Sequence, residues 1–159
     1  MSESKGGVNE PVLITLSPSR ANDYLNCPLL YRFRTIDKFP EPPSREAIKG
    51  TLVHSVLEKL YGLSRGERTL AVAESEVLPL WNEMKATRDD VRELCVTLNE
   101  DEFLLSSLAL VKKYFELEDP TSFDPTELET HVEVKLDESL LIHGYIDRLD
   151  IAPTGEIRI

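Results

Sequence analysis

The sequence has few cysteines and no long hydrophobic run. Only two cysteines occur among 159 residues, Cys27 and Cys95, and they form no paired motif, so nothing calls for an oxidising compartment. No apolar stretch approaches the length of about 20 residues that spans a bilayer. The first eleven residues, MSESKGGVNEP, lack the hydrophobic segment of a secretory signal. We therefore expect a cytoplasmic protein with no membrane partner and a flexible tail over residues 1–12.

Basic residues are also in short supply. The chain has 18 Lys and Arg against 29 Asp and Glu, a formal net charge of −11 at pH 7. Because nucleic-acid binding draws much of its affinity from basic side chains that neutralise phosphates, this balance alone argues against a nucleic-acid partner. The charge is uneven, however, since six basic residues occur between Arg20 and Lys49 against four acidic ones. The acidic total therefore leaves room for a locally basic face and for a metal site built from carboxylates.

What is present is the pattern of a soluble globular domain, helical in its first part. Apolar residues make up 41% and charged residues 30%. A chain of this length and composition can bury a hydrophobic core without disulfide bonds or structural metal ions. The run Leu16-Ser17-Pro18-Ser19 is a predicted helix start with a serine cap, and Cys27-Pro28 should break or kink the helix that follows. Ser44 caps a second predicted helix, which runs to Tyr61 and stops at Gly62. Further helices are predicted near 69–86, 88–98 and 101–117.

The periodicity changes after Pro125. Residues 131–136 alternate polar and apolar side chains, residues 140–151 form a second strand-like run, and 156–159 open a third. Short turns join the three runs. Helices over 17–118 followed by an antiparallel β-meander over 127–159 predict a mixed α/β (α+β) fold in one domain from residue 13 to 159.

Two polar features invite a chemical interpretation. His54 and Glu58 are four residues apart, so on a helix they share a face and could hold a divalent ion or orient a water. A surface His-Glu pair with no further role is the alternative. Asp147 lies within a predicted strand, where Asp is disfavoured, so its presence there needs an explanation such as a functional role. The alternative is an exposed strand end at Asp147-Arg148.

The remaining candidates are weak individually. His131 and His143 fit half-exposed strand residues as well as ligands, and Glu133 could belong to a solvated row. One cysteine, Cys27, is not a site, because iron-sulfur and zinc centres usually take four protein ligands. Cys95 fits an ordinary core thiol.

Three stretches together resemble a known family. They are LSPSRANDYLNCPLLYRFR, KGTLVHSVLEKLY and HGYIDRLDIAPTGEIRI, in that order. They resemble the RecB-family exonucleases of the PD-(D/E)XK nuclease superfamily, of the small type that carries an iron-sulfur cluster. The resemblance runs from about Leu16 to Ile159 and implies a restriction-endonuclease-like core that hydrolyses DNA, from ends or as single strands, in repair or recombination.

The resemblance also implies roles for individual residues. His54 would be the helix histidine near the metal, Asp147 the first metal-ligating aspartate, and Cys27 the first of four cysteines of a 4Fe-4S cluster. Glu58 matches the acid that ends the helix motif. Supporting roles fall to an acid on the first strand, Glu133, and to Arg148, while Asp150 is expected to be structural. The implied ion is Mg²⁺ or Mn²⁺.

In that family the third strand continues into an Asp-x-Lys segment that supplies a second acidic ligand and a lysine. Ile159 falls just before its expected place, so we expect the N-terminal part of a longer nuclease. Alone, this part should hydrolyse little or no DNA and hold no cluster. Two alternatives stay open: a non-catalytic DNA-binding or scaffold module of the same fold, and an acidic helical adapter whose partner is a protein.

Overall fold

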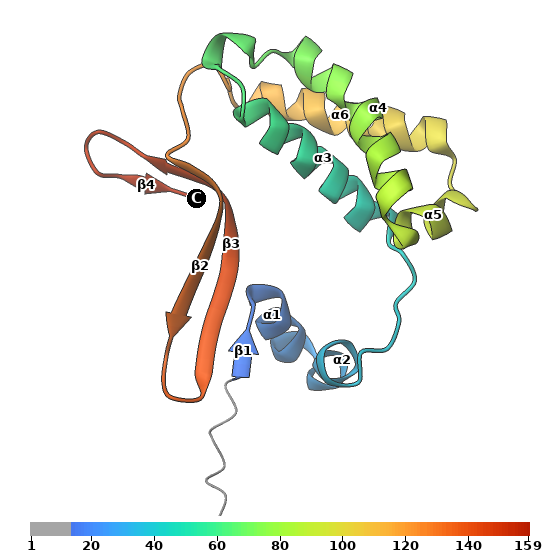
Figure 1. The fold of residues 1–159 in the computed structure, drawn as a ribbon, viewed down its shortest axis with the longest axis vertical. Helices are drawn as coiled ribbons and strands as arrows, with labels where there is room; N and C mark the ends of the chain where they lie inside the picture. Colours follow the sequence, from blue (N-terminus) through green and yellow to red (C-terminus); the bar gives the residue numbers. More distant parts are fainter. Residues whose placement is uncertain (1–13) are drawn as a thin grey trace, which may run out of the picture. The chain divides into compact units, whose positions relative to one another are not determined.

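The computed structural model describes residues 14–159, so the tail expected over residues 1–12 lies outside the described residues. This part of the chain combines six α-helices with a four-stranded sheet, which confirms the predicted α+β class (Figure 1). In chain order the elements are β1 (Ile14–Leu16), α1 (Pro18–Asn26), α2 (Pro28–Tyr31), a π-helical segment (Arg32–Ile36), α3 (Arg45–Tyr61), a 3₁₀ turn (Arg65–Glu67), α4 (Leu70–Thr87), α5 (Asp89–Cys95), α6 (Glu100–Leu117), β2 (Glu127–Lys135), β3 (Leu140–Ile151) and β4 (Ile157–Arg158).

The described residues fall into two compact units. The first comprises the chain up to Pro40 together with Thr130–Ile146. The second comprises Glu41–Glu129 and Asp147–Ile159. The boundary passes through β2 and β3, so each of these strands contributes residues to both units.

Helices α3, α4 and α6 form the core of the second unit, where they lie side by side (Figure 1). Helix α3 begins and ends where the sequence predicts: the Ser44 hydroxyl accepts a hydrogen bond from the backbone N–H of Ala47 at 3.3 Å, and Gly62 follows the last turn. Its buried residues at spacings of four make one apolar stripe: Ile48, Leu52, Val56 and Leu60. Trp81 of α4 and Phe103 of α6 are fully buried, with ring centroids 4.6 Å apart. This packing makes α3 a rigid support for the side chains on its opposite face.

A buried arginine fixes the link between α6 and β2. Arg68, with 4% of its surface exposed, donates hydrogen bonds to the carbonyl oxygens of Pro120 and Phe123 and to the Asp124 carboxylate. Backbone carbonyls that no helix or strand satisfies thus find a charged donor inside the unit. The link delivers the chain to the start of β2 in a defined position.

The first unit is built around the hairpin of β2 and β3. As predicted, Ser17 caps α1, and the helix stops before Cys27-Pro28, where α2 begins. A Cβ atom at Gly144 would lie 3.6 Å from the Pro18 ring, an ordinary van der Waals contact, so α1 packs closely against β3 at this point. Within the described residues, this unit contains no fully buried side chain.

The sheet differs from the prediction at its edges. Strand β3 has the predicted bounds, but β2 begins at Glu127 rather than at residue 131. A further strand, β1, pairs with β3 in parallel, outside the predicted meander of residues 127–159, and the sequence analysis did not predict it. Three residues of β1 are too short for an alternating pattern to reveal them. Strand β4 pairs with β3 antiparallel, as predicted.

None of the helices in residues 14–159 has both the length and the apolar character that a membrane span requires.

Candidate functional site

The second unit brings two of the predicted site residues together. His54 and Glu58 occupy successive turns of α3, as their spacing predicts, and Asp147 lies on β3. The His54 Nδ1 atom is 3.6 Å from the Asp147 Oδ2 atom. Both side chains are well exposed, at 63% and 64%. The pair is therefore open to solvent and to a ligand from outside.

A glutamate that the sequence analysis did not single out belongs to the same place. Glu129, near the start of β2, lines a surface hollow together with His54, Glu58 and Asp147. Desolvation raises the pKa of the Glu129 carboxyl, the charges of Glu58 and Asp147 raise it further, and His54 opposes them. Two neighbouring carboxylates thus disfavour the charged form of Glu129, a repulsion that a cation in the same place would relieve.

The backbone of Glu129 takes a conformation that side chains rarely adopt. Its φ angle is +48°, in the left-handed region, although the residue lies within β2. Such a conformation costs about 1–2 kcal/mol for a residue other than glycine. Alternation of Leu128 with its charged neighbours could have extended the predicted strand back to Glu127, but nothing in the sequence signals this bend.

Beside these acids lies a cavity of about 320 Å³. The acidic side chains form part of its wall, and the rest comes from α3, α6 and the strands: Leu57, Tyr61, Tyr114, Glu118, Leu128, Arg148, Arg158 and Ile159. This volume is at the lower end of the range for small-ligand sites.

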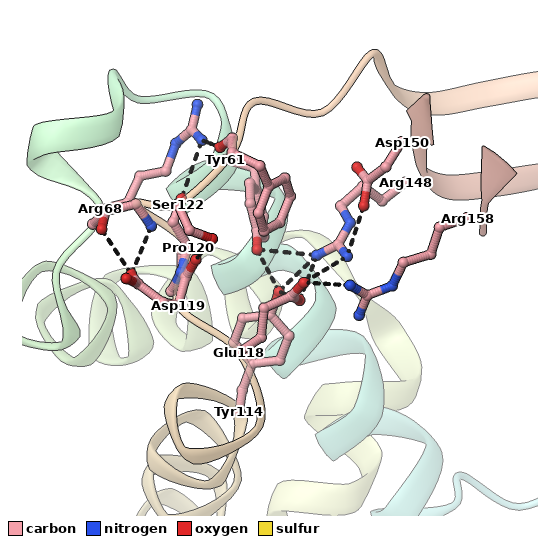
Figure 2. Close-up of polar contacts among 12 residues, drawn as sticks. Tyr61, Arg68, Tyr114, Glu118, Asp119, Pro120, Ser122, Arg148, Asp150 and Arg158 are labelled. Atoms are coloured by element: carbon pink, nitrogen blue, oxygen red, sulfur yellow. Dashed lines mark hydrogen bonds and ion pairs between the residues drawn. The ribbon is translucent and has the colours of Figure 1, made fainter. Parts of the chain in front are cut away.

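Arg148, predicted only as a supporting residue, lies at the centre of a polar cluster (Figure 2). Its Nη1 atom donates to the hydroxyls of Tyr61 at 3.0 Å and Tyr114 at 2.9 Å. Both of its Nη atoms bind the Glu118 carboxylate, at 2.8 and 3.1 Å. Asp150, expected to be structural, adds an ion pair at 3.0 Å. The Arg148 guanidinium also lies over the ring of Phe123, 4.7 Å from its centroid.

These contacts shift the pKa values of the cluster. Burial disfavours the charged form of Arg148, but its hydrogen bond to Glu118 and the surrounding negative charge raise its pKa above the ordinary value. Burial would raise the pKa of Glu118, yet hydrogen bonds from Arg148 and Tyr114 lower it. Burial raises the pKa of both tyrosines. At neutral pH the cluster therefore holds an ion pair and two neutral phenols.

The other predicted residues lie in the first unit. Glu133 is an exposed residue of β2 there, and Cys27 is an exposed free thiol between α1 and α2. His131 and His143 also belong to this unit, with their ring centroids 6.0 Å apart. Cys95 of the second unit is partly buried, and this burial raises the pKa of its thiol. A cluster that needs four thiolates is not supplied by a chain with two cysteines.

Within residues 14–159, no group of three or more His, Cys, Asp or Glu side chains is arranged to hold a metal ion. The His54–Asp147 pair nevertheless fits part of a coordination shell. Two ligands that each lie about 2.1 Å from one ion are themselves about 3–3.5 Å apart, close to the observed separation of 3.6 Å.

Comparison with known proteins gives one family. The model of the PD-(D/E)XK nuclease superfamily matches residues 15–159, almost the whole chain. No curated protein and no solved structure matches the chain.

Proposed function

Because the chain belongs to the PD-(D/E)XK nuclease superfamily, whose members generally hydrolyse phosphodiester bonds with divalent metals, we propose that it is a metal-dependent DNA exonuclease of the RecB type. The family gives the general chemistry. The RecB type, the DNA ends as substrate and a role in repair or recombination belong to the proposal.

The observation that carries it is the approach of His54 to Asp147. The two residues are 93 positions apart in the sequence, from 54 to 147. His54 lies on helix α3 and Asp147 on strand β3. An imidazole nitrogen and a carboxylate oxygen form a mixed donor pair, and the carboxylate suits Mg²⁺ or Mn²⁺.

Four residues of the chain would act at the proposed metal site. His54 and Asp147 would bind the ion, and Glu58 and Glu129 would add negative charge around it. A bound divalent ion supplies Lewis-acid polarisation of the phosphoryl group and a lowered pKa of water. Glu129 lines the same surface pocket as His54 and Asp147, where its carboxylate would accept a hydrogen bond from a water beside the ion, a role that we add to the proposal.

The test is an end-dependence assay with the intact natural protein. Linear DNA should be degraded in the presence of Mg²⁺ or Mn²⁺, while covalently closed circular DNA stays intact. Asp147→Ala should slow the reaction at least a hundredfold. Equal rates for wild type and Asp147→Ala, or equal attack on circles and linear DNA, would contradict the proposed exonuclease.

One observation favours a second candidate, a non-catalytic DNA-binding module of the same fold. In the part of the chain that the structure describes, residues 14–159, no group of three or more His, Cys, Asp or Glu side chains is arranged to hold a metal ion. For this reason we expect the 159-residue chain alone to hydrolyse little or no DNA. If the intact natural protein binds DNA ends in a salt-dependent manner but never cleaves them, the second candidate holds.

A 4Fe-4S cluster in the natural protein, with Cys27 as one of its ligands, is also part of the proposal. Two observations support it. The Cys27 thiol is exposed, and the stretch around it, LSPSRANDYLNCPLLYRFR, resembles the iron-sulfur type of this family. Natural protein purified without oxygen should be brown and contain about four iron atoms per chain, and Cys27→Ser should lose them. An iron-free wild-type protein would exclude the cluster.

A further inference from the structure

Asp147 has little to hold it in place through its own side chain. Its carboxylate is 64% exposed, and within residues 14–159 its one close polar contact is His54, at 3.6 Å. An exposed pair at this distance contributes little binding energy. The position of the carboxylate must therefore come from the backbone of β3 and from whatever anchors that strand.

The next residue supplies such an anchor. We infer that Arg148 and Glu118 act as positioning residues, which together with Tyr61 and Tyr114 hold the Asp147 carboxylate opposite His54; this inference rests on the proposed metal-binding role of that pair. We call these four residues the Arg148 clamp (Figure 2).

The clamp joins β3 to two helices at once. Tyr61 belongs to α3, Tyr114 belongs to α6, and Glu118 caps the end of α6. The Arg148 guanidinium also packs against two neighbouring rings, 5.2 Å from the centroid of Tyr61 and 4.7 Å from that of Phe123, whose own centroids are 5.7 Å apart. A planar group that is bound along its edge and packed against two rings has little freedom to rotate or slide.

The helix that receives the clamp is also the helix that carries the histidine. Tyr61 follows His54 by seven residues, about two turns or about 10 Å along α3. Adjacent residues of β3 thus contact α3 at two separated points: Asp147 approaches His54, and Arg148 binds Tyr61. Two points of contact fix both the position and the direction of this end of β3. A single contact would allow the strand end to rotate about it.

Metal ligands tolerate displacements of only a few tenths of an ångström. Loss of the clamp should therefore weaken metal binding even though none of its residues is a proposed ligand. A residue that served stability alone would lower the melting temperature without changing the metal affinity of the folded protein.

The chain offers a matched control on the same helix. Glu100, the first residue of α6, accepts a hydrogen bond from Trp81 Nε1 at 2.8 Å and pairs with Lys85. Like Glu118, it is a carboxylate bound by an aromatic donor and a cation, which lower its pKa; Glu118 has a second cation, Arg158, at 3.0 Å. It lies at the opposite end of α6, about 27 Å away along the helix, and contacts no residue of β3.

The experiment measures Mn²⁺ affinity by calorimetry for the full chain and its variants, at a temperature where circular dichroism shows each to be folded. We expect Glu118→Gln to bind Mn²⁺ at least tenfold more weakly than wild type, and Glu100→Gln to stay within twofold. Arg148→Lys, which keeps the charge but loses the two-pronged contact, should lie between them. It also serves as the test variant should Glu118→Gln not fold.

Asp147→Asn distinguishes a failure of the positioning inference from a failure of the proposed metal site. If Asp147→Asn abolishes Mn²⁺ binding while Glu118→Gln and Arg148→Lys bind as tightly as Glu100→Gln, the clamp has no positioning role and the proposed function stands. If Asp147→Asn binds Mn²⁺ as wild type does, the proposed site is wrong and the positioning inference falls with it.

Discussion

The guanidinium of Arg148 and the carboxylate of Glu118 form two parallel hydrogen bonds, Nη1 to Oε2 at 2.8 Å and Nη2 to Oε1 at 3.1 Å. Their side chains are only 17% and 11% exposed. A second arginine, Arg158, reaches the same carboxylate at 3.0 Å. This pair ties β3 to the end of α6, next to the residue on which the proposed chemistry depends.

Removal of one partner should be costly. Arg148→Met would leave the Glu118 carboxylate largely buried with its strongest partner lost, and we expect the free energy of unfolding to fall by about 3 kcal/mol. Arg45→Met is the control, because Arg45 pairs with Glu102 at 2.9 Å in a far more exposed setting and should cost less than about 1 kcal/mol. Urea unfolding measures both. Equal losses would mean that the burial of the Arg148 pair adds nothing to stability.

Acid should weaken the same pair. The folded-state pKa of Glu118 lies below its ordinary value of 4.5, so the stabilisation that its charged form provides is present above about pH 4.5 and is lost as the pH falls through the folded-state pKa. The difference in unfolding free energy between wild type and Glu118→Gln should therefore be greatest near neutral pH and shrink below pH 4.5. Thermal melts at several pH values measure it. A difference that stays constant down to pH 3 would show that the Glu118 pKa is not lowered.

The two units should respond differently to truncation of the same residue type. Leu52 of α3 is fully buried, and Leu52→Ala should cost about 2–5 kcal/mol. Leu25 of α1 is 81% exposed, and Leu25→Ala should change stability by no more than about 0.5 kcal/mol. Urea unfolding of both variants tests the assignment of the core. A comparable loss for Leu25→Ala would mean that this leucine is covered in solution.

Much of the fold could be predicted from local sequence signals. Ser44 and Gly62 mark the ends of α3 because caps and stops act within a few residues, and the Pro28 break follows from the missing N–H of proline. The run Leu140–Ile151 has the predicted bounds of β3 because turn residues flank it. The parallel strand β1 was missed, because its partner lies more than a hundred residues away and a three-residue strand carries no period.

The site was predictable only in part, for a similar reason. The spacing of His54 and Glu58 is local, and Asp147 is conspicuous within a strand. The pairing of Arg148 with Glu118 depends on how β3 meets α6, and no pattern in either segment encodes that meeting. Glu129 depends on a left-handed backbone angle at a residue other than glycine, which no sequence rule would have placed there.

The most direct test of the central claim is where a divalent cation binds. The chain contains three histidines, His54, His131 and His143, so each imidazole can be followed in one NMR spectrum while Mn²⁺ is added in small amounts. A paramagnetic ion broadens the signals of nearby nuclei. The account predicts that the His54 signals broaden first and that Asp147→Asn abolishes this effect. Broadening of His131 and His143 before His54, or broadening of His54 that Asp147→Asn leaves unchanged, would contradict it.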